Sequence, residues 1–264
     1  MKKYIEIAKI LFKAQLTWRF DIAFNMLFTI TKILFAYILW GAIFGEQNEI
    51  AGFSFNTLLT YYIISSFLSG LDMSERISGE ISAHIRDGSF SKYMVLPVKI
   101  IRHFGAQTVG TTSFYMLFNI LAAVVWVFIF KIQFAITSNV GTILSAILIV
   151  ILGLVFMVQL SFFLGILTFK FQDIWIFLMI KGTFVAFITG TMIPLVLLPQ
   201  GIVSVMRFFP FYYVTYLPSM LFVGRNQNEI GVGFITLFIW VLIFIPINQL
   251  TYNRLRIKYD GVGI

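Results

Sequence analysis

The sequence contains no cysteine, and its only histidines are His84 and His103. The chain can therefore form neither disulfide bonds nor thiolate metal sites, and two isolated histidines make no metal-ligand cluster. Charged residues are also scarce, at 11% of 264 residues, whereas a soluble domain has about 25%. Together with 59% hydrophobic residues, this scarcity indicates an integral membrane protein. We expect a single transmembrane domain over residues 1–264.

Motifs for catalysis and for ion coupling are missing as well. No G-x-x-x-x-G-K-[ST] phosphate loop occurs, so nothing in the chain indicates ATP hydrolysis. No Ser/His/Asp arrangement or H-E-x-x-H motif is visible, and we predict no catalytic residue. The apolar stretches lack a central Asp or Glu, although proton- and cation-coupled carriers usually rely on buried carboxylates. These absences favour a pore-forming body that needs an external source of energy.

Six apolar stretches are long enough to cross about 30 Å of hydrocarbon as helices, which predicts an all-α, polytopic membrane protein. The predicted spans are residues 22–44, 55–73, 106–130, 140–169, 174–197 and 230–250. Ahead of them, residues 1–20 set lysines against apolar residues at helical spacing. That pattern predicts an amphipathic N-terminal helix lying at the cytoplasmic membrane interface.

The distribution of lysine and arginine predicts the orientation of these spans. Cytoplasmic loops carry an excess of both residues, so we attribute the +8 net charge to topology and predict no nucleic-acid partner. With both termini inside, the outer segments contain only Lys131, Arg207 and Arg225. A seventh span through residues 199–222 would place the basic C-terminus outside, against this rule. Six spans with both termini in the cytoplasm are therefore predicted.

Two lysines lie within predicted spans. Lys32, near the centre of the first span, shares one helix stripe with Asn25 and Thr29. A central lysine costs about 2.5–3.5 kcal/mol on insertion scales, so this stripe should face other helices or a cavity. Lys181 enters the fifth span by about two turns, a depth from which its side chain can snorkel to the inner surface. All four residues are candidates for a transport pathway, and a structural role is the alternative for both lysines.

Residues 75–97 form the only long run between hydrophobic segments that mixes both charge signs. Isoleucines recur there at every fourth residue, which places one stripe on a helix at Ile77, Ile81 and Ile85. Polar and charged side chains fall mainly on the other faces, at Glu80, His84 and Asp87. Gly88 is a predicted left-handed helix stop. This pattern suits a helix that docks a soluble partner, and an ordinary interfacial helix is the alternative.

Prolines divide the stretch after the fifth span into apolar pieces that are too short to cross a membrane. We predict that residues 193–222 form re-entrant or interfacial helices at the outer face. The dividing prolines are Pro194, Pro199, Pro210 and Pro218.

Three segments of the chain resemble ABC transporter permeases of the type-2 exporter class. Residues 80–97, E-I-S-A-H-I-R-D-G-S-F-S-K-Y-M-V-L-P, are similar to the inner loop of that class. Residues 190–224, with G-T-M-I-P-L-V-L-L-P and F-F-P-F-Y-Y-V-T-Y-L-P-S-M-L-F-V-G, resemble its outer proline-rich segment. Residues 255–263, L-R-I-K-Y-D-G-V-G, are similar to the ending of a subgroup encoded as two paired permeases beside an ATPase. The order and spacing of these segments extend the resemblance over the whole chain.

The resemblance implies the membrane subunit of an ATP-driven exporter in a bacterial plasma membrane. In that class, two six-span subunits, identical or paralogous, form the pathway, and two copies of a separate cytoplasmic ATPase bind ATP and Mg²⁺. This chain would bind no cofactor itself. The resemblance assigns coupling to residues 74–91, through Ile77, Glu80, Ile81, His84, Ile85, Arg86 and Gly88. It assigns the outer gate to residues 193–222, with Pro194, Pro199, Pro210 and Pro218.

Two other classes of protein stay open. An ion-coupled secondary carrier would show inverted repeats, and residues 22–130 and 140–250 show no convincing one. A membrane-embedded enzyme or assembly factor would need convergent polar side chains at a common depth, and the sequence offers few. The sequence does not identify the cargo, because 31 phenylalanines suit lipid contact and an apolar pathway equally well.

The missing phosphate loop generates a first prediction. The purified chain alone should hydrolyse no ATP, because it has no backbone cradle for nucleotide phosphates. A phosphate-release assay on protein freed of every other polypeptide checks this, and sustained hydrolysis would contradict an exporter subunit that depends on a separate ATPase.

Overall fold

The computed structural model describes residues 2–17, 19–45, 47–50, 52–130, 133–190 and 195–259. Within these ranges the chain is helical, and its only β-type pairing is an isolated bridge between Ile50 and Phe53. The prediction of an all-α fold is therefore confirmed.

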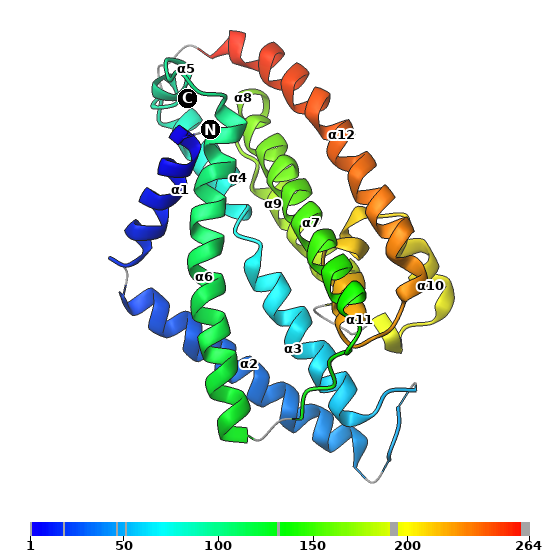
Figure 1. The fold of residues 1–264 in the computed structure, drawn as a ribbon. Coiled ribbons are helices and arrows are strands. Elements are labelled where there is room, and N and C mark those ends of the chain that lie inside the picture. Colours follow the sequence, from blue (N-terminus) through cyan, green and yellow to red (C-terminus); the bar gives the residue numbers. More distant parts are fainter. Residues whose placement is uncertain are drawn as a thin grey trace.

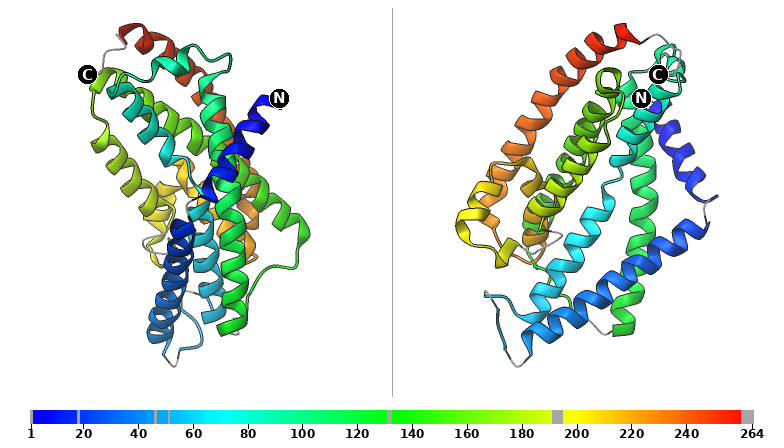
Figure 2. Two further views of the ribbon diagram at one scale, coloured as in Figure 1. Left: turned by 90° about the vertical axis from the view of Figure 1, so that its left-hand side faces the viewer. Right: turned by 180° about the vertical axis from the view of Figure 1, so that it is seen from behind.

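Long helices form an elongated bundle (Figure 1). They are α2 (Arg19–Phe44), α3 (Phe55–Leu71), α6 (Ile100–Phe130), α7 (Val140–Ile166), α9 (Trp175–Ile188) and α12 (Ile230–Leu255). Both chain ends lie at one end of this bundle, as Figure 2 also shows from behind. The same end holds the short helices α4 (Glu75–Arg86), α5 (Ser91–Met94) and α8 (Thr168–Phe171). We call it the inner end and the opposite one the outer end.

Three helical stretches among the described residues are both long and apolar enough to cross a membrane. They are Met26–Phe44, Val140–Phe171 and Gln227–Leu255, and they correspond to three of the six predicted spans. Two further helices are shorter than the roughly 20 residues that a span needs, with 17 residues in α3 and 14 in α9. The length and composition of these helices thus support a membrane protein.

The fifth predicted span is shorter than expected. Its helix α9 ends at Ile188, and Gly190 then adopts a φ of 75°, which turns the chain out of the helix. A Cβ added at Gly190 would lie 3.0 Å from the Tyr61 hydroxyl and 3.1 Å from Leu195 Cγ, so this turn fits glycine. A 3₁₀ turn, η1 (Leu195–Leu197), resumes the described chain. Helix α9 is therefore shorter than the predicted span of residues 174–197.

The proline-rich stretch consists of short helical pieces. They are α10 (Gln200–Met206), the π-helical turn η2 (Tyr212–Tyr216), α11 (Leu217–Phe222) and the 3₁₀ turn η3 (Gln227–Glu229). Residues 212–221 are buried against the rest of the protein. At the end of this stretch, the backbone N–H of Thr137 donates to Phe222 O at 2.8 Å, which ties it to the loop between α6 and α7. Backbone groups in such short pieces need protein around them at membrane depth, and this packing supplies it.

The N-terminal helix α1 (Lys2–Gln15) packs lengthwise on α6 at the inner end (Figure 1). A Cβ added at Gly110 of α6 would collide with the backbone of Ala8, so the two helices touch closely. The Phe12 and Phe114 rings meet edge to face with centroids 5.4 Å apart. Helix packing therefore holds α1, in addition to any attraction between its lysines and a membrane surface.

The short pieces at residues 195–222 generate a topology prediction. No described helix there is longer than the 7 residues of α10, and even η2 with α11 spans only about 16 Å at the usual helical rise. A tag placed after Gly224 should therefore lie outside and a tag after Ile264 inside, because the short pieces leave the chain at the outer face and α12 is the apolar helix between the tags. Protease protection of each tag in sealed vesicles checks this, and protection on the same side would contradict six spans.

Candidate coupling site

The isoleucine stripe of α4 faces inward and packs on α7. Ile81 and Ile85 are fully buried and Ile77 nearly so, in a cluster with Phe162, Ile166 and Phe169. Gly165 of α7 lies directly under this stripe, since an added Cβ would meet Ile81 Cβ at 3.0 Å and Ser78 Cα at 3.1 Å. The stripe therefore anchors α4 to the bundle and leaves the opposite face of the helix for any partner.

The outward face of α4 carries charges of both signs. Its exposed side chains are those of Glu75, Arg76, Glu80, Ala83 and Arg86, with Gly79 between them. Partial burial by neighbouring chain raises the pKa of Glu80, although His84, Arg76 and Lys92 oppose this shift. A Cβ added at Gly79 would meet no atom within 4 Å, so this point of the face is open. Such a surface can form charged contacts with a complementary protein.

A hydrogen-bonded turn ends α4. Gly88 adopts a φ of 77°, as the left-handed helix stop requires. The Ser89 N–H and hydroxyl both donate to Asp87 Oδ1, at 2.9 Å and 2.6 Å, and they lower the pKa of that carboxyl. Ser89 Oγ also lies 2.7 Å from His84 Nδ1. The turn is thus fixed by its own side chains, and Gly88 supplies the backbone shape that this arrangement needs.

A buried polar cluster connects the start of α4 to α7 and α9. Ser74 Oγ lies 3.1 Å from Ser161 Oγ of α7, and both serines are fully buried. Lys181 Nζ of α9 donates to the same Ser161 Oγ at 3.3 Å. The Ser74 N–H donates to Asp72 Oδ1 at 3.0 Å. We call Asp72, Ser74, Ser161 and Lys181 the junction cluster.

Lys181 does not snorkel to the surface as the sequence suggested, because its side chain is 8% exposed. It lines a small cavity of about 180 Å³ that Asp72 and Glu75 also line. Burying a lysine is expensive unless opposite charge or hydrogen bonds compensate it, and this cavity offers both. The structure thus places Lys181 at the base of α4, apart from the other lysine of the predicted pathway.

Lys32 lies on an exposed part of α2, whereas Ile33, Ala36 and Trp40 of the same helix are buried. It lines neither of the two cavities described for this protein. The side chains of Asn25 and Thr29 lie outside the described residues, so the predicted polar stripe stays a prediction.

The predicted gate prolines have different surroundings. Pro199 is exposed at the start of α10, Pro210 is buried, and Pro218 is buried in the first turn of α11. Pro194 lies outside the described residues. Sequence reasoning missed the polar contacts beside them, in which Arg207 Nη2 donates to Glu229 Oε1 at 2.8 Å and the Tyr212 hydroxyl donates to Glu229 Oε2 at 2.9 Å. Only the opposite charges of Arg207 and Glu229 could have signalled this pair.

In the part of the chain that the structure describes, the apolar helices long enough to cross a membrane are those of a membrane protein. The family model described as ABC-2 family transporter protein matches residues 30–263. The chain belongs to this family, which makes it a transport permease and confirms the resemblance seen in the sequence. Permeases of the family work with ATPase partners. No curated protein matches the chain.

The junction cluster generates a stability prediction. Ser161→Ala removes the hydroxyl that contacts both Ser74 and Lys181, and leaving buried polar groups unsatisfied costs about 1–3 kcal/mol. The variant should therefore unfold at a lower temperature in detergent than the unaltered protein. Ser145→Ala, on the same helix, is the matched control because its hydroxyl donates only to Gly141 O one turn away. Equal melting temperatures of the two variants would show that the cluster contributes nothing.

Proposed function

We propose that this chain is the membrane subunit of an ATP-driven exporter and is coupled to a separate cytoplasmic ATPase. The observation that carries the proposal is the orientation of α4, whose apolar stripe is buried on α7 while its charged face is open. The assembly would contain two permease subunits and two ATPase copies, which bind ATP and Mg²⁺. The inner end would face the cytoplasm of a bacterial cell, with six spans in the plasma membrane.

Contact with the ATPase would reach the bundle through both ends of α4. At its C-terminal end, Glu80, His84 and Arg86 surround the open face, and Gly88 closes the helix. At its N-terminal end, the junction cluster leads through Ser161 to Lys181 on α9. Displacement of α4 by the ATPase would therefore act on both α7 and α9. This route supports coupling because it consists of buried contacts rather than solvent-exposed side chains.

The stretch 195–222 would close the outer end of the pathway. Its buried tyrosines pack on α3 and α7, with the Tyr61 and Tyr216 rings 5.9 Å apart. Arg207, Tyr212 and Glu229 hold α10, η2 and η3 together through direct hydrogen bonds. Such side-chain contacts can exchange partners more readily than a packed apolar core, which suits a part that opens.

A second permease subunit would cover apolar surface on α2 and α9. Phe20 is 82% exposed, and Trp175 and Ile176 are 63% and 61% exposed. Lipid covers such residues equally well, so they support a subunit interface without identifying its partner. The partner would be a second copy or a paralogue.

The open face of α4 generates the test of this proposal. Gly79→Trp adds bulk where an added Cβ meets no atom within 4 Å, so the fold should persist while ATPase docking is blocked. Glu80→Ala should also weaken docking, since losing a partly buried interface charge costs about 2–5 kcal/mol. Co-purification of the ATPase and transport at matched protein levels measure both effects.

Gly79→Ala is the matched control, because it adds only a methyl group at the same point and favours the helix by about 0.5–1 kcal/mol. It should retain transport and ATPase binding. Normal ATPase binding and transport by Gly79→Trp would refute docking on this face.

A further inference from the structure

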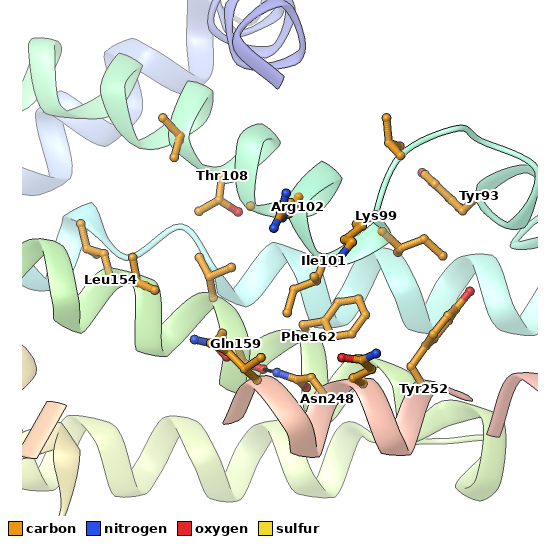
Figure 3. Close-up of a pocket in the computed structure, with 18 of the residues that line it drawn as sticks. Tyr93, Lys99, Ile101, Arg102, Thr108, Leu154, Gln159, Phe162, Asn248 and Tyr252 are labelled. Atoms are coloured by element: carbon orange, nitrogen blue, oxygen red, sulfur yellow. Dashed lines mark hydrogen bonds between the residues drawn. The ribbon is translucent and has the colours of Figure 1, made fainter. Parts of the chain in front are cut away.

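A large cavity opens between α6, α7 and α12 at the inner end, with a volume of about 890 Å³. Figure 3 shows Lys99, Arg102 and Thr108 on one side of it, opposite Gln159, Asn248 and Tyr252. This volume falls within the roughly 300–1,000 Å³ of small-molecule sites. Neither the predicted gate nor the open face of α4 contributes to its lining.

The lining changes in character with depth. Basic side chains gather at the helix ends, where Lys99 precedes α6, Arg102 lies in its first turn and Arg256 follows α12. Gln159 and Asn248 lie about 10 Å deeper, since each precedes the end of its helix by about two turns. Aliphatic residues line the wall beyond them, at Val109, Ile151, Leu154, Val155 and Ile245. The cationic rim suits the charged head group of an anionic amphiphile, and the apolar channel suits its hydrocarbon chain.

The amide pair between the basic rim and the aliphatic wall is buried and incompletely hydrogen-bonded. Gln159 is 6% exposed and Asn248 2%, and the Asn248 Nδ2 donates to Gln159 O at 3.1 Å. Yet Gln159 Oε1 and Asn248 Oδ1 have no hydrogen-bond donor among the described residues. Buried acceptors of this kind are costly when left unpaired.

The charge of the rim favours an anion. Asp72 is the single carboxylate among the lining residues, and its Oδ1 already accepts from the Ser74 N–H at 3.0 Å. The lining also contains three cationic side chains, those of Lys99, Arg102 and Arg256. The backbone N–H of Lys99 donates to the Tyr4 hydroxyl at 3.3 Å, so α1 steadies this part of the rim. Clusters of basic residues at this level are typical of sites for anionic lipid head groups.

We propose that this cavity binds an anionic phospholipid of the phosphatidylglycerol type. Its phosphate contacts Lys99, Arg102 and Arg256, and one acyl chain lies along the aliphatic wall. The wall includes Tyr93 next to the end of α4 and Phe162 beneath its isoleucine stripe, so an occupied cavity braces the region that holds α4. The site is separate from the proposed ATPase contact and does not depend on it.

The test measures the melting temperature of the purified full chain in detergent while phosphatidylglycerol is added. A saturable rise is expected with phosphatidylglycerol. Phosphatidylcholine of the same chain length and glycerol 3-phosphate should give none, because the first lacks net charge and the second lacks acyl chains. An equal rise with phosphatidylcholine would show general lipid solvation, and an equal rise with glycerol 3-phosphate would show an anion site only. Either result would overturn the proposal.

Two variants locate the site. The pair Arg102→Gln with Arg256→Gln should raise the half-saturating concentration of phosphatidylglycerol about 30-fold, which corresponds to about 1 kcal/mol for each basic residue near an anionic head group. The pair Lys170→Gln with Arg254→Gln removes the same charge from exposed inner-end residues that do not line the cavity, and should bind as the unaltered protein does. Equal weakening by both pairs would reduce the effect to general surface charge and overturn the proposal.

A third variant fills the cavity. A Cβ added at Gly105 would lie 3.7 Å from Val158 Cγ1, which is ordinary contact, so Gly105→Leu fits the helix and occupies the channel. It should keep or raise the melting temperature without lipid and abolish the rise with phosphatidylglycerol. A full lipid response in this variant would exclude the cavity as the binding site.

Discussion

The close contact between α4 and α7 at Gly165 is the constraint on which the inner end of this permease depends. Glycine suits this position, because an added Cβ would lie 3.0 Å from Ile81 Cβ and 3.1 Å from Ser78 Cα, which is tighter than most Cβ contacts. Ser161 lies one turn earlier on the same face of α7 and meets Ser74 at the start of α4. Steric fit and a hydrogen bond therefore fix α4 at two points, and its charged face can point only outward.

Lys181 shows how the junction cluster accommodates a buried charge. Its hydrogen bond to Ser161 is long, at 3.3 Å, while the carboxylates of Asp72 and Glu75 line the same cavity. A buried ammonium group must keep some polar partner, since an unpaired one is strongly destabilising. The hydroxyl of Ser161 and the carboxylates that line the cavity supply this polar environment for Lys181. Lys181, which is an isolated charge in the sequence, thus lies where α4, α7 and α9 meet.

Local patterns made much of this structure predictable. The four-residue isoleucine repeat located α4, and the long apolar run located α7, because both signals depend on neighbours within one helix. The end of α9 was not predictable, since Tyr61 and Leu195 decide what fits at Gly190. The junction cluster was missed for a similar reason: Ser74 and Ser161 are 87 residues apart, and serines are too common to signal a pair. Cavity-lining amides such as Asn248 gave no sequence signal either.

Helix α7 joins the two ends of the protein through a second glycine contact. A Cβ added at Gly153 would lie 3.1 Å from Val214 Cα, in the π-helical turn η2 of the outer stretch. Gly153 and Gly165 are separated by about 18 Å along one uninterrupted helix, so α7 touches α4 near one end and η2 near its middle. Interdigitated contacts of this kind transmit displacement because they cannot compress. One helix, α7, therefore contacts both α4 and η2, a helical form that is often found at functional sites.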